Sequence, residues 1–263
     1  MEWSEVTNQY ISELNTIKID DELKQRIVAV IDYTSLNESD TEQTIASLCE
    51  QVETPYGFVA GLCVGLPFVR MVKASIGKLP LKAITVANFP EAQLTLEEVL
   101  VEIGCALRDG ADEIDVVFPY HRYLAGERRY AQDFVTACKT ACGPGLGLKI
   151  ILETGILADL AIIADAAHDA LSAGADFVKT STGKNGPGAS LEAAATLLLV
   201  VKHVNGQTVR PLGVKVSGGI KTLEQAAQYI SLADHIMGPE WVSPHTFRIG
   251  TSKLVDELSS VRI

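Results

Sequence analysis

The chain has 263 residues, of which 47% are hydrophobic and 21% charged, a composition typical of a globular protein with enough chain to bury a large core. Its formal net charge of -11 at pH 7 argues against nucleic acid or an anionic membrane surface as the main partner. An anionic ligand would therefore need a local cationic pocket.

The first residues, "MEWSEVTNQYISELN", are typical of an acidic helix and not of a basic and apolar leader. The sequence also lacks an apolar run of about 18 residues, so we expect a cytoplasmic protein.

The odd number of cysteines favours reduced thiols: Cys49, Cys63, Cys105, Cys138 and Cys142. Cys138 and Cys142 share a helix face, but no histidine stands at ligand spacing from them, and we expect no metal site.

Eight short runs rich in β-branched residues predict eight strands. They lie at 26–34, 57–64, 82–88, 112–118, 148–154, 175–181, 212–218 and 233–238. Most are about 25 to 35 residues apart, the length of one strand and one helix with their loops. Helix starts are predicted at three capping boxes: Ser39 with Glu42, Thr95 with Glu98, and Thr222 with Gln225.

Eight strands alternating with helices over about 250 residues predict an α/β fold, a (β/α)8 TIM barrel. The first two dozen residues would form an extra N-terminal helix, and residues 1–263 a single domain. The alternative is a doubly wound open sheet, which is expected to carry a glycine fingerprint after its first strand. The segment that follows the first strand here, "DYTSLNESD", contains no glycine.

Charged residues interrupt four of the expected strands close to their carboxyl ends. Strand side chains in a barrel alternate between the interior and the helix layer, and the catalytic face lies at the carboxyl ends. If the apolar neighbours face the helices, four charged side chains converge at the barrel mouth: Asp32, Asp115, Lys179 and Lys215.

Two lysines beside two carboxylates suit a reaction through a lysine imine. A lysine with its ordinary pKa of about 10.4 is protonated at pH 7 and is a poor nucleophile. Burial next to a second ammonium lowers that pKa, and the carboxylates can move protons. The pattern leaves open which lysine attacks. The alternative is a set of buried ion pairs that only fills the barrel, but four charges at one mouth favour catalysis.

Two further residues stand at strand ends. Glu153, in "ILETG", is either an additional acid or a partner that holds a lysine, and we favour the partner. Cys63, at the end of the second expected strand, is more typical of an inert core thiol than of a nucleophile.

Glycine-containing segments at the same end predict a phosphate site. "STGK" (181–184) follows the sixth strand, "SGGIKT" (217–222) follows the seventh, and "RIGTSKL" (248–254) is expected to open the last helix. Backbone N–H groups at such positions bind phosphate, and the loops after the last two strands are its usual place in this fold. The residues expected to approach the phosphate are Gly183, Lys184, Gly218, Gly219, Gly250 and Ser252.

Several stretches closely resemble deoxyribose-phosphate aldolases, a family of class I aldolases: "DYTSL", "TVANFP", "GADEIDVVFPY", "KIILETG", "GADFVKTSTGK", "GVKVSGGI" and "FRIGTS". The resemblance extends from about residue 27 to residue 255, and "DFVKTSTGK" together with "VKVSGG" is its most specific part. It implies reversible cleavage of 2-deoxy-D-ribose 5-phosphate to D-glyceraldehyde 3-phosphate and acetaldehyde. It also implies an enzyme of deoxynucleoside catabolism that needs no metal or cofactor and forms a homodimer.

The resemblance assigns a role to each residue at the mouth. Lys179 would form the Schiff base, Asp115 would donate and accept protons through water, and Lys215 would lower the pKa of Lys179. Asp32 would support the proton relay, and Cys63 would line the substrate pocket.

The sequence departs from the family pattern at two places. Lys253 follows Ser252 where a second serine is familiar, and it would either strengthen phosphate binding or point to solvent. The last residues, "ELSSVRI", lack the C-terminal tyrosine of some members, so we do not expect proton transfer by the tail.

Two other functions stay open. A metal-free phosphosugar isomerase with Glu153 as its base would need no pair of lysines and would leave no covalent adduct. A non-catalytic barrel would bind a phosphosugar without forming product.

Overall fold

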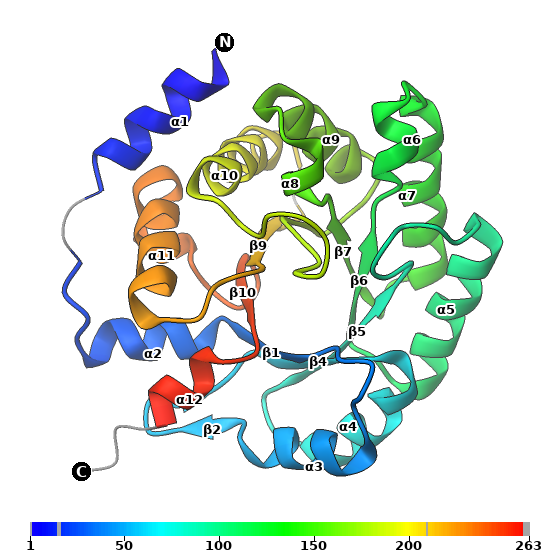
Figure 1. Ribbon diagram of the computed structural model, residues 1–263, viewed down its shortest axis with the longest axis vertical. Helices are drawn as coiled ribbons and strands as arrows, with labels where there is room; N and C mark the ends of the chain where they lie inside the picture. Colours follow the sequence, from blue (N-terminus) through cyan, green and yellow to red (C-terminus); the bar gives the residue numbers. More distant parts are fainter. Residues whose placement is uncertain (1, 15–16, 209, 260–263) are drawn as a thin grey trace.

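The computed structural model describes residues 2–14, 17–208 and 210–259. Eight parallel strands form a closed barrel surrounded by helices (Figure 1), which confirms the predicted (β/α)8 architecture. Neighbouring strands follow the order β1-β10-β9-β8-β7-β6-β5-β4. These strands are β1 (Ile31–Ser35), β4 (Gly61–Val64), β5 (Lys82–Ala87), β6 (Glu113–Val117), β7 (Gly147–Ile151), β8 (Phe177–Lys179), β9 (Gly213–Ser217) and β10 (Phe247–Thr251).

Each barrel strand is followed in the chain by a helix of the outer layer. These helices are α3 (Glu42–Glu50), α4 (Val69–Ile76), α5 (Leu96–Asp109), α7 (Arg128–Cys142), α9 (Leu160–Ser172), α10 (Leu191–Asn205), α11 (Leu223–Met237) and α12 (Leu254–Ser259). The connections hold the short elements β2 (Glu53–Thr54), β3 (Gly57–Phe58), η1 (Leu66–Phe68), α6 (Tyr120–Leu124), α8 (Thr154–Leu157) and η2 (Pro239–Trp241). None of the helices in these described ranges is long and apolar enough to cross a membrane.

Two helices precede the barrel, whereas the sequence predicted one. α1 (Trp3–Ser12) lies outside the helix layer against α10 and α11 (Figure 1). α2 (Asp21–Ala29) begins after Asp20, whose carboxylate accepts a hydrogen bond from the Leu23 N–H. The prediction of a strand over 26–34 was therefore wrong in its first half, because α2 is short and its apolar end merges with the apolar start of β1.

The eighth strand is not at 233–238. That segment is the last part of α11, where Ala233 and Ile236 are buried at helical spacing, and the helix ends before Gly238. The strand that closes the barrel is β10, in the stretch predicted to open the last helix. β10 carries Arg248 and Gly250 between its apolar residues, and neither residue type marks a buried strand.

Two other boundaries differ from the prediction. The predicted strand 57–64 divides into β3, which pairs with β2 in a small hairpin, and the barrel strand β4. The first capping box lies at Thr41 with Thr44 and not at Ser39 with Glu42. The other two boxes are confirmed: Thr95 with Glu98, and Thr222 with Gln225.

The predicted alternation of side chains is confirmed. The apolar strand residues assigned to the outer face lie in the main core between barrel and helices: Ile114, Val116, Val178, Val214 and Val216. The barrel interior holds a small apolar cluster of Cys63, Ile84 and Val86 that is separate from this core. Its remaining inward positions are largely polar, and this is where the candidate site lies.

Candidate active site

The barrel interior contains a buried group of charged side chains. Four are the predicted residues Asp32, Asp115, Lys179 and Lys215. Three lie outside the predicted set: Glu113, Lys149 and Arg248. The same alternation could have found Lys149, because Leu148 and Ile150 flank it on the helix-facing side.

Asp115, on β6, is the acceptor for three lysines. Its Oδ2 accepts hydrogen bonds from the Nζ of Lys215 at 2.7 Å and of Lys179 at 2.9 Å, and its Oδ1 from Lys149 at 3.0 Å. Burial alone would raise the pKa of Asp115, but its lysine neighbours, Lys149 first among them, hold it well below its usual range. Asp115 is therefore a carboxylate, and because Lys179 and Lys215 share one of its oxygens, their amines are neighbours.

The two lysines at the mouth differ in how many carboxylates they contact. Lys215 contacts Asp115 and also Asp32, at 2.6 Å, and although burial opposes it, these charges raise the pKa of Lys215 above its ordinary value. Lys179, within the described part of the chain, forms an ion pair with Asp115 alone. Burial, reinforced by the charge of Lys215 and opposed by Asp115, lowers the pKa of Lys179. Lys179 is thus the amine that loses its proton first, a distinction that strand alternation could not make.

The charged groups form a closed ring in which the sign alternates. Arg248 joins Asp32 to Glu113, donating to Glu113 Oε1 at 2.8 Å, and Glu113 Oε2 lies 2.6 Å from Lys149. The charge ring consists, in order of contact, of Lys215, Asp32, Arg248, Glu113, Lys149 and Asp115. Burial would raise the pKa of Asp32, but Arg248 and Lys215 lower it to about 2.

Lys179 is the one lysine of the group outside the charge ring, attached to it through Asp115. The ring is balanced, with three carboxylates and three cations. A charged Lys179 would add an unbalanced positive charge in a site removed from water, which is unfavourable. A neutral Lys179 leaves the group balanced, in agreement with the direction of its pKa.

A cavity of about 450 Å³ opens at the carboxyl ends of the strands and reaches Lys179. All the predicted phosphate-site residues line it: Gly183, Lys184, Gly218, Gly219, Gly250 and Ser252. Lys221 and Lys253 also line it, so three lysines besides Lys179 stand around the cavity. This local cationic rim fits an anionic ligand despite the negative net charge of the chain.

Gly218 and Gly250 are required by the space around them. Gly218 has a φ of 91°, and a Cβ there would lie 2.9 Å from the Cα of Gly188. Gly250 lies on β10, not at the start of the last helix as predicted, and a Cβ there would lie 3.1 Å from Lys215 Cε. Glycine at position 250 thus leaves room for the Lys215 side chain.

The opposite end of the barrel interior is filled by side chains. Phe177 packs over Gly213, where a Cβ would lie 2.2 Å from the Phe177 ring. A second cavity, of about 440 Å³, at that end is lined by Arg248 but not by Lys179. Of these two cavities, the one at the carboxyl ends of the strands reaches Lys179.

Two predicted residues behave differently from expectation. Glu153 was predicted to hold a lysine, but its carboxylate accepts from the hydroxyl of Thr182 at 2.5 Å and from its N–H at 3.2 Å, and it forms no ion pair within the described ranges. Cys63 is buried inside the barrel against Ile84 and Val86, and burial raises the pKa of its thiol. A protonated Cys63 is consistent with a core role.

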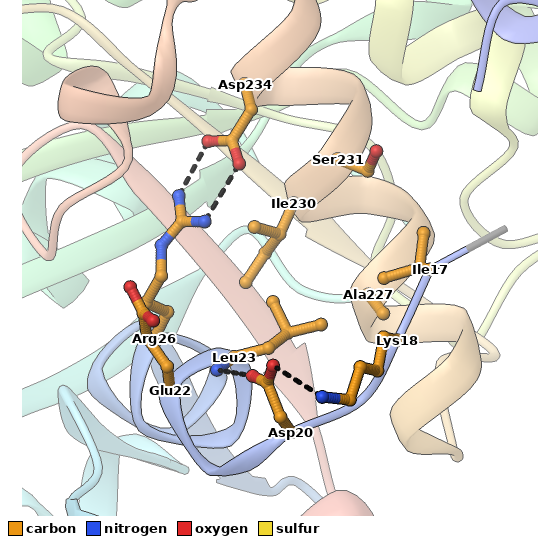
Figure 2. A pocket seen from close by; sticks show the side chains of 10 residues that line it. All are labelled: Ile17, Lys18, Asp20, Glu22, Leu23, Arg26, Ala227, Ile230, Ser231 and Asp234. Atoms are coloured by element: carbon orange, nitrogen blue, oxygen red, sulfur yellow. Dashed lines mark hydrogen bonds and ion pairs between the residues drawn. The ribbon is translucent and has the colours of Figure 1, made fainter. Parts of the chain in front are cut away.

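A smaller pocket on the outer layer, between α2 and α11, offers no comparable chemistry among the residues that line it (Figure 2). Its cations are paired with carboxylates: two hydrogen bonds of 2.9 Å and 2.6 Å join Arg26 to Asp234, and Lys18 lies 3.9 Å from Asp20. The barrel mouth is therefore the candidate active site.

Comparisons with known proteins show the family of this chain. A family model described as DeoC/LacD family aldolase matches residues 26–239. The deoxyribose-phosphate aldolase of Agrobacterium fabrum is 40% identical over 235 residues, 89% of each chain. A structure described as a tetrameric deoxyribose phosphate aldolase from Aeropyrum pernix is 26% identical, with a TM-score of 0.73 over 98% of this chain and 99% of that one.

A candidate deoxyribose-phosphate aldolase of Toxoplasma gondii superimposes with a TM-score of 0.82 at 25% identity, covering 91% of this chain and 94% of the other. The family match, the similarity over most of each relative and the lysine-centred barrel mouth lead to one assignment. This chain belongs to the DeoC/LacD aldolase family.

Proposed function

We propose that this protein is a deoxyribose-phosphate aldolase that cleaves 2-deoxy-D-ribose 5-phosphate to D-glyceraldehyde 3-phosphate and acetaldehyde through an imine on Lys179. The observation that carries the proposal is the position of Lys179: it is buried, lies outside a balanced charge ring and is reached by the cavity. A neutral amine so placed is a nucleophile for an aldehyde carbon.

In the proposed reaction, Lys179 Nζ attacks C1 of the open-chain sugar, and loss of water gives the protonated imine. Removal of the proton from the C3 hydroxyl breaks the C2–C3 bond, and its electron pair moves into the imine to give an enamine. Glyceraldehyde 3-phosphate leaves. Protonation of the enamine at C2 and hydrolysis of the resulting imine release acetaldehyde and restore Lys179.

The neighbouring groups supply the proton transfers. Asp115, hydrogen-bonded to both lysines, would move protons through water between the amine and the substrate. Lys215 keeps a positive charge beside Lys179 and so favours its neutral form, while Asp32 holds Lys215 in place. The resemblance also implies a place for Cys63 in the substrate pocket, but Cys63 is fully buried and does not line the cavity, so we assign it no contact with the substrate.

The phosphate would bind at the rim of the cavity. The glycine loops after β8 and β9 and the turn after β10 bring backbone and lysine groups to the same cavity as Lys179. Lys184, Lys221 and Lys253 would supply positive charge there. Lys253 lines the cavity, which favours a part in phosphate binding over a purely solvent-facing position.

Trapping of the imine tests the proposal. The protein is incubated with acetaldehyde or 2-deoxyribose 5-phosphate and sodium borohydride, and the adduct is located by intact-mass measurement and peptide mapping. We expect a reduced adduct on Lys179 that is absent from Lys179→Ala. Lys202→Met serves as the matched control, because the Nζ of Lys202 donates to the Ile236 carbonyl on the helix layer, away from the site.

An adduct on Lys215 would keep the aldolase and exchange the roles of the two lysines. A folded protein that forms no adduct but isomerises a phosphosugar would favour the isomerase. Ligand-dependent stabilisation without any product would favour a non-catalytic binding protein.

The homodimer implied by the resemblance also stays a prediction. Light scattering on the purified protein gives the mass of the assembly directly, and a tetramer, as described for the Aeropyrum pernix relative, would contradict it.

A further inference from the structure

Glu153 is a buried carboxyl group that the proposed reaction does not use. It follows β7 at the catalytic end of the barrel, is fully buried, and has a φ of 57°. A residue with a side chain adopts this conformation rarely, and it persists where the surroundings fix it. The hydrogen bonds that the described residues donate to its carboxylate come from Thr182, in the loop between β8 and α10, and the charge of Lys179 acts on it without forming an ion pair.

Thr182 links Glu153 to the backbone of that loop. The Thr182 hydroxyl donates to Glu153 Oε2 at 2.5 Å and accepts from the N–H groups of Lys184 at 3.1 Å and Asn185 at 3.3 Å. A hydroxyl has one hydrogen to donate and two lone pairs to accept with, so all of its capacity is used. The orientation of these N–H groups is thus set by the hydroxyl, and that of the hydroxyl by Glu153.

The loop is also fixed farther along. Asn185 Nδ2 donates to the Pro90 carbonyl at 3.0 Å, and the Ala189 N–H donates to the carbonyls of Ser217 and Gly218 at 3.1 Å. Gly183 and Lys184 lie between β8 and these hydrogen bonds. Together with Thr182, they line the cavity that reaches Lys179. Glu153 therefore holds the part of the loop that borders the cavity.

We propose that Glu153 is a positioning residue: through Thr182 it holds the loop of residues 182–185 in the shape that receives the substrate phosphate, and so sets the preference for phosphorylated over unphosphorylated sugars. The inference rests on the proposed function, because it assumes that the phosphate binds at this rim. Lys179 donates its hydrogen bond to Asp115 and not to Glu153, so the chemical step has no direct need of Glu153.

A carboxylate is suited to this position because both groups that it contacts on Thr182 are donors. It accepts from the hydroxyl and from the N–H at once. Both of these bonds end on Oε2, and the Thr182 N–H also approaches Oε1 at 3.4 Å. In Glu153→Gln the amide oxygen can take the place of Oε2, but the NH2 group then lies against the Thr182 N–H. With the amide reversed, the NH2 group lies against a hydroxyl oxygen whose lone pairs are already used. The side-chain volume is kept while the hydrogen-bond pattern is broken.

The test compares Glu153→Gln, Thr182→Val and the double variant with wild type, using 2-deoxyribose 5-phosphate and unphosphorylated 2-deoxyribose. We expect KM for the phosphorylated sugar to rise about tenfold, as for the loss of one well-placed hydrogen bond, with kcat changed much less. KM for the unphosphorylated sugar should change little. Because both variants break the same link, the double variant should resemble each single variant.

Thr196→Val is the matched control, since it removes another buried threonine hydroxyl, which donates to the Glu192 carbonyl within α10. It should keep the wild-type selectivity, and Thr182→Ser, which retains the hydroxyl, should recover most of the loss in Thr182→Val. Equal losses with both sugars, or additive effects in the double variant, would overturn the inference. A wild-type protein that cleaves neither sugar would overturn the proposed function and the inference with it.

Discussion

Two lysines on adjacent strands, Lys179 and Lys215, acquire opposite pKa shifts from one difference in their surroundings. Both are buried and both contact Asp115. Lys215 has a second carboxylate, Asp32, whereas the described residues give Lys179 no such second partner. The number of carboxylates around each amine therefore assigns the proposed nucleophile and the proposed electrostatic partner without reference to any relative.

Replacement of Lys215 tests this assignment. Lys215→Met removes the positive neighbour of Lys179 and leaves Asp115, so the pKa of Lys179 should rise. Activity requires the neutral amine and increases as pH rises through that pKa, so the acid limb of kcat/KM should move to higher pH. At a pH below both pKa values, a rise of one in the pKa of Lys179 lowers the rate about tenfold. A Lys215→Met enzyme with an unmoved acid limb would contradict this account.

Asp32 makes the free energy of unfolding depend on pH in the acid range. Its pKa is about 2 in the folded protein. The ordinary pKa of aspartate is about 3.9, so Asp32 binds a proton less readily in the folded protein than in the unfolded chain. The ionised Asp32 therefore stabilises the folded protein. This stabilisation is complete above pH ~5 and is lost as the pH falls through ~2. Asp32→Asn does not titrate, so its unfolding free energy should fall by about 1 kcal/mol less than that of wild type between pH 6 and pH 3.

Urea titrations of both proteins at these two pH values measure the difference. A parallel decline in the two proteins would show that Asp32 does not carry this pH dependence.

At the scale of elements, prediction succeeded where apolar and charged residues alternate clearly. On β6 and β9 that alternation identified Asp115 and Lys215 as inward-facing. β10 was missed because Arg248 and Gly250 occupy its inward positions and leave few apolar residues to mark a strand. Arg248 and Gly250 fit at these positions only once the barrel is closed. Closure brings Arg248 into contact with Asp32 and Glu113, and it brings Gly250 beside Lys215. Contacts between distant strands are not visible in local sequence.

The two glycine loops of the mouth meet backbone to backbone. A Cβ at Gly188 would lie 2.2 Å from the carbonyl oxygen of Gly218, so Gly188→Ala must push the loops after β8 and β9 apart. We expect weaker binding of the phosphate, with KM for 2-deoxyribose 5-phosphate rising by about tenfold or more and imine trapping with acetaldehyde much less affected.

Gly104→Ala is the comparison for this variant. Gly104 lies in α5, and a Cβ added there would meet no atom of the described residues within 4 Å outside its own helix turn. Because alanine favours a helix over glycine, the substitution should raise the free energy of unfolding by up to about 1 kcal/mol. It should leave KM unchanged. An unchanged KM in Gly188→Ala would contradict the proposed phosphate site.

For the whole molecule, the charge ring connects strands on different sides of the barrel. Arg248, on β10, joins Asp32 on the adjacent β1 to Glu113 on β6, which lies elsewhere in the barrel. Arg248→Met would leave two buried carboxylates short of a cation, and we expect a loss of about 3–5 kcal/mol in unfolding free energy. Denaturant titration measures it.

Addition of Glu113→Gln to Arg248→Met should restore part of the stability, because the remaining ring of Lys215, Asp32, Lys149 and Asp115 then has equal numbers of carboxylates and cations. Failure of this double variant to recover any stability would indicate that Arg248 acts through packing and not through charge.

The packing of Phe177 over Gly213, at the end of the barrel opposite the cavity, has a consequence for the order in which products leave. Lys179 is reached from the carboxyl-end cavity, whose rim carries the proposed phosphate site. In the proposed reaction, the two-carbon fragment would stay bonded to Lys179 after cleavage, with the phosphorylated fragment between it and solvent. Glyceraldehyde 3-phosphate must then depart first and acetaldehyde second, and in the synthetic direction acetaldehyde must enter first. Product inhibition should follow this ordered scheme, with acetaldehyde competing directly with the phosphorylated sugar for free enzyme.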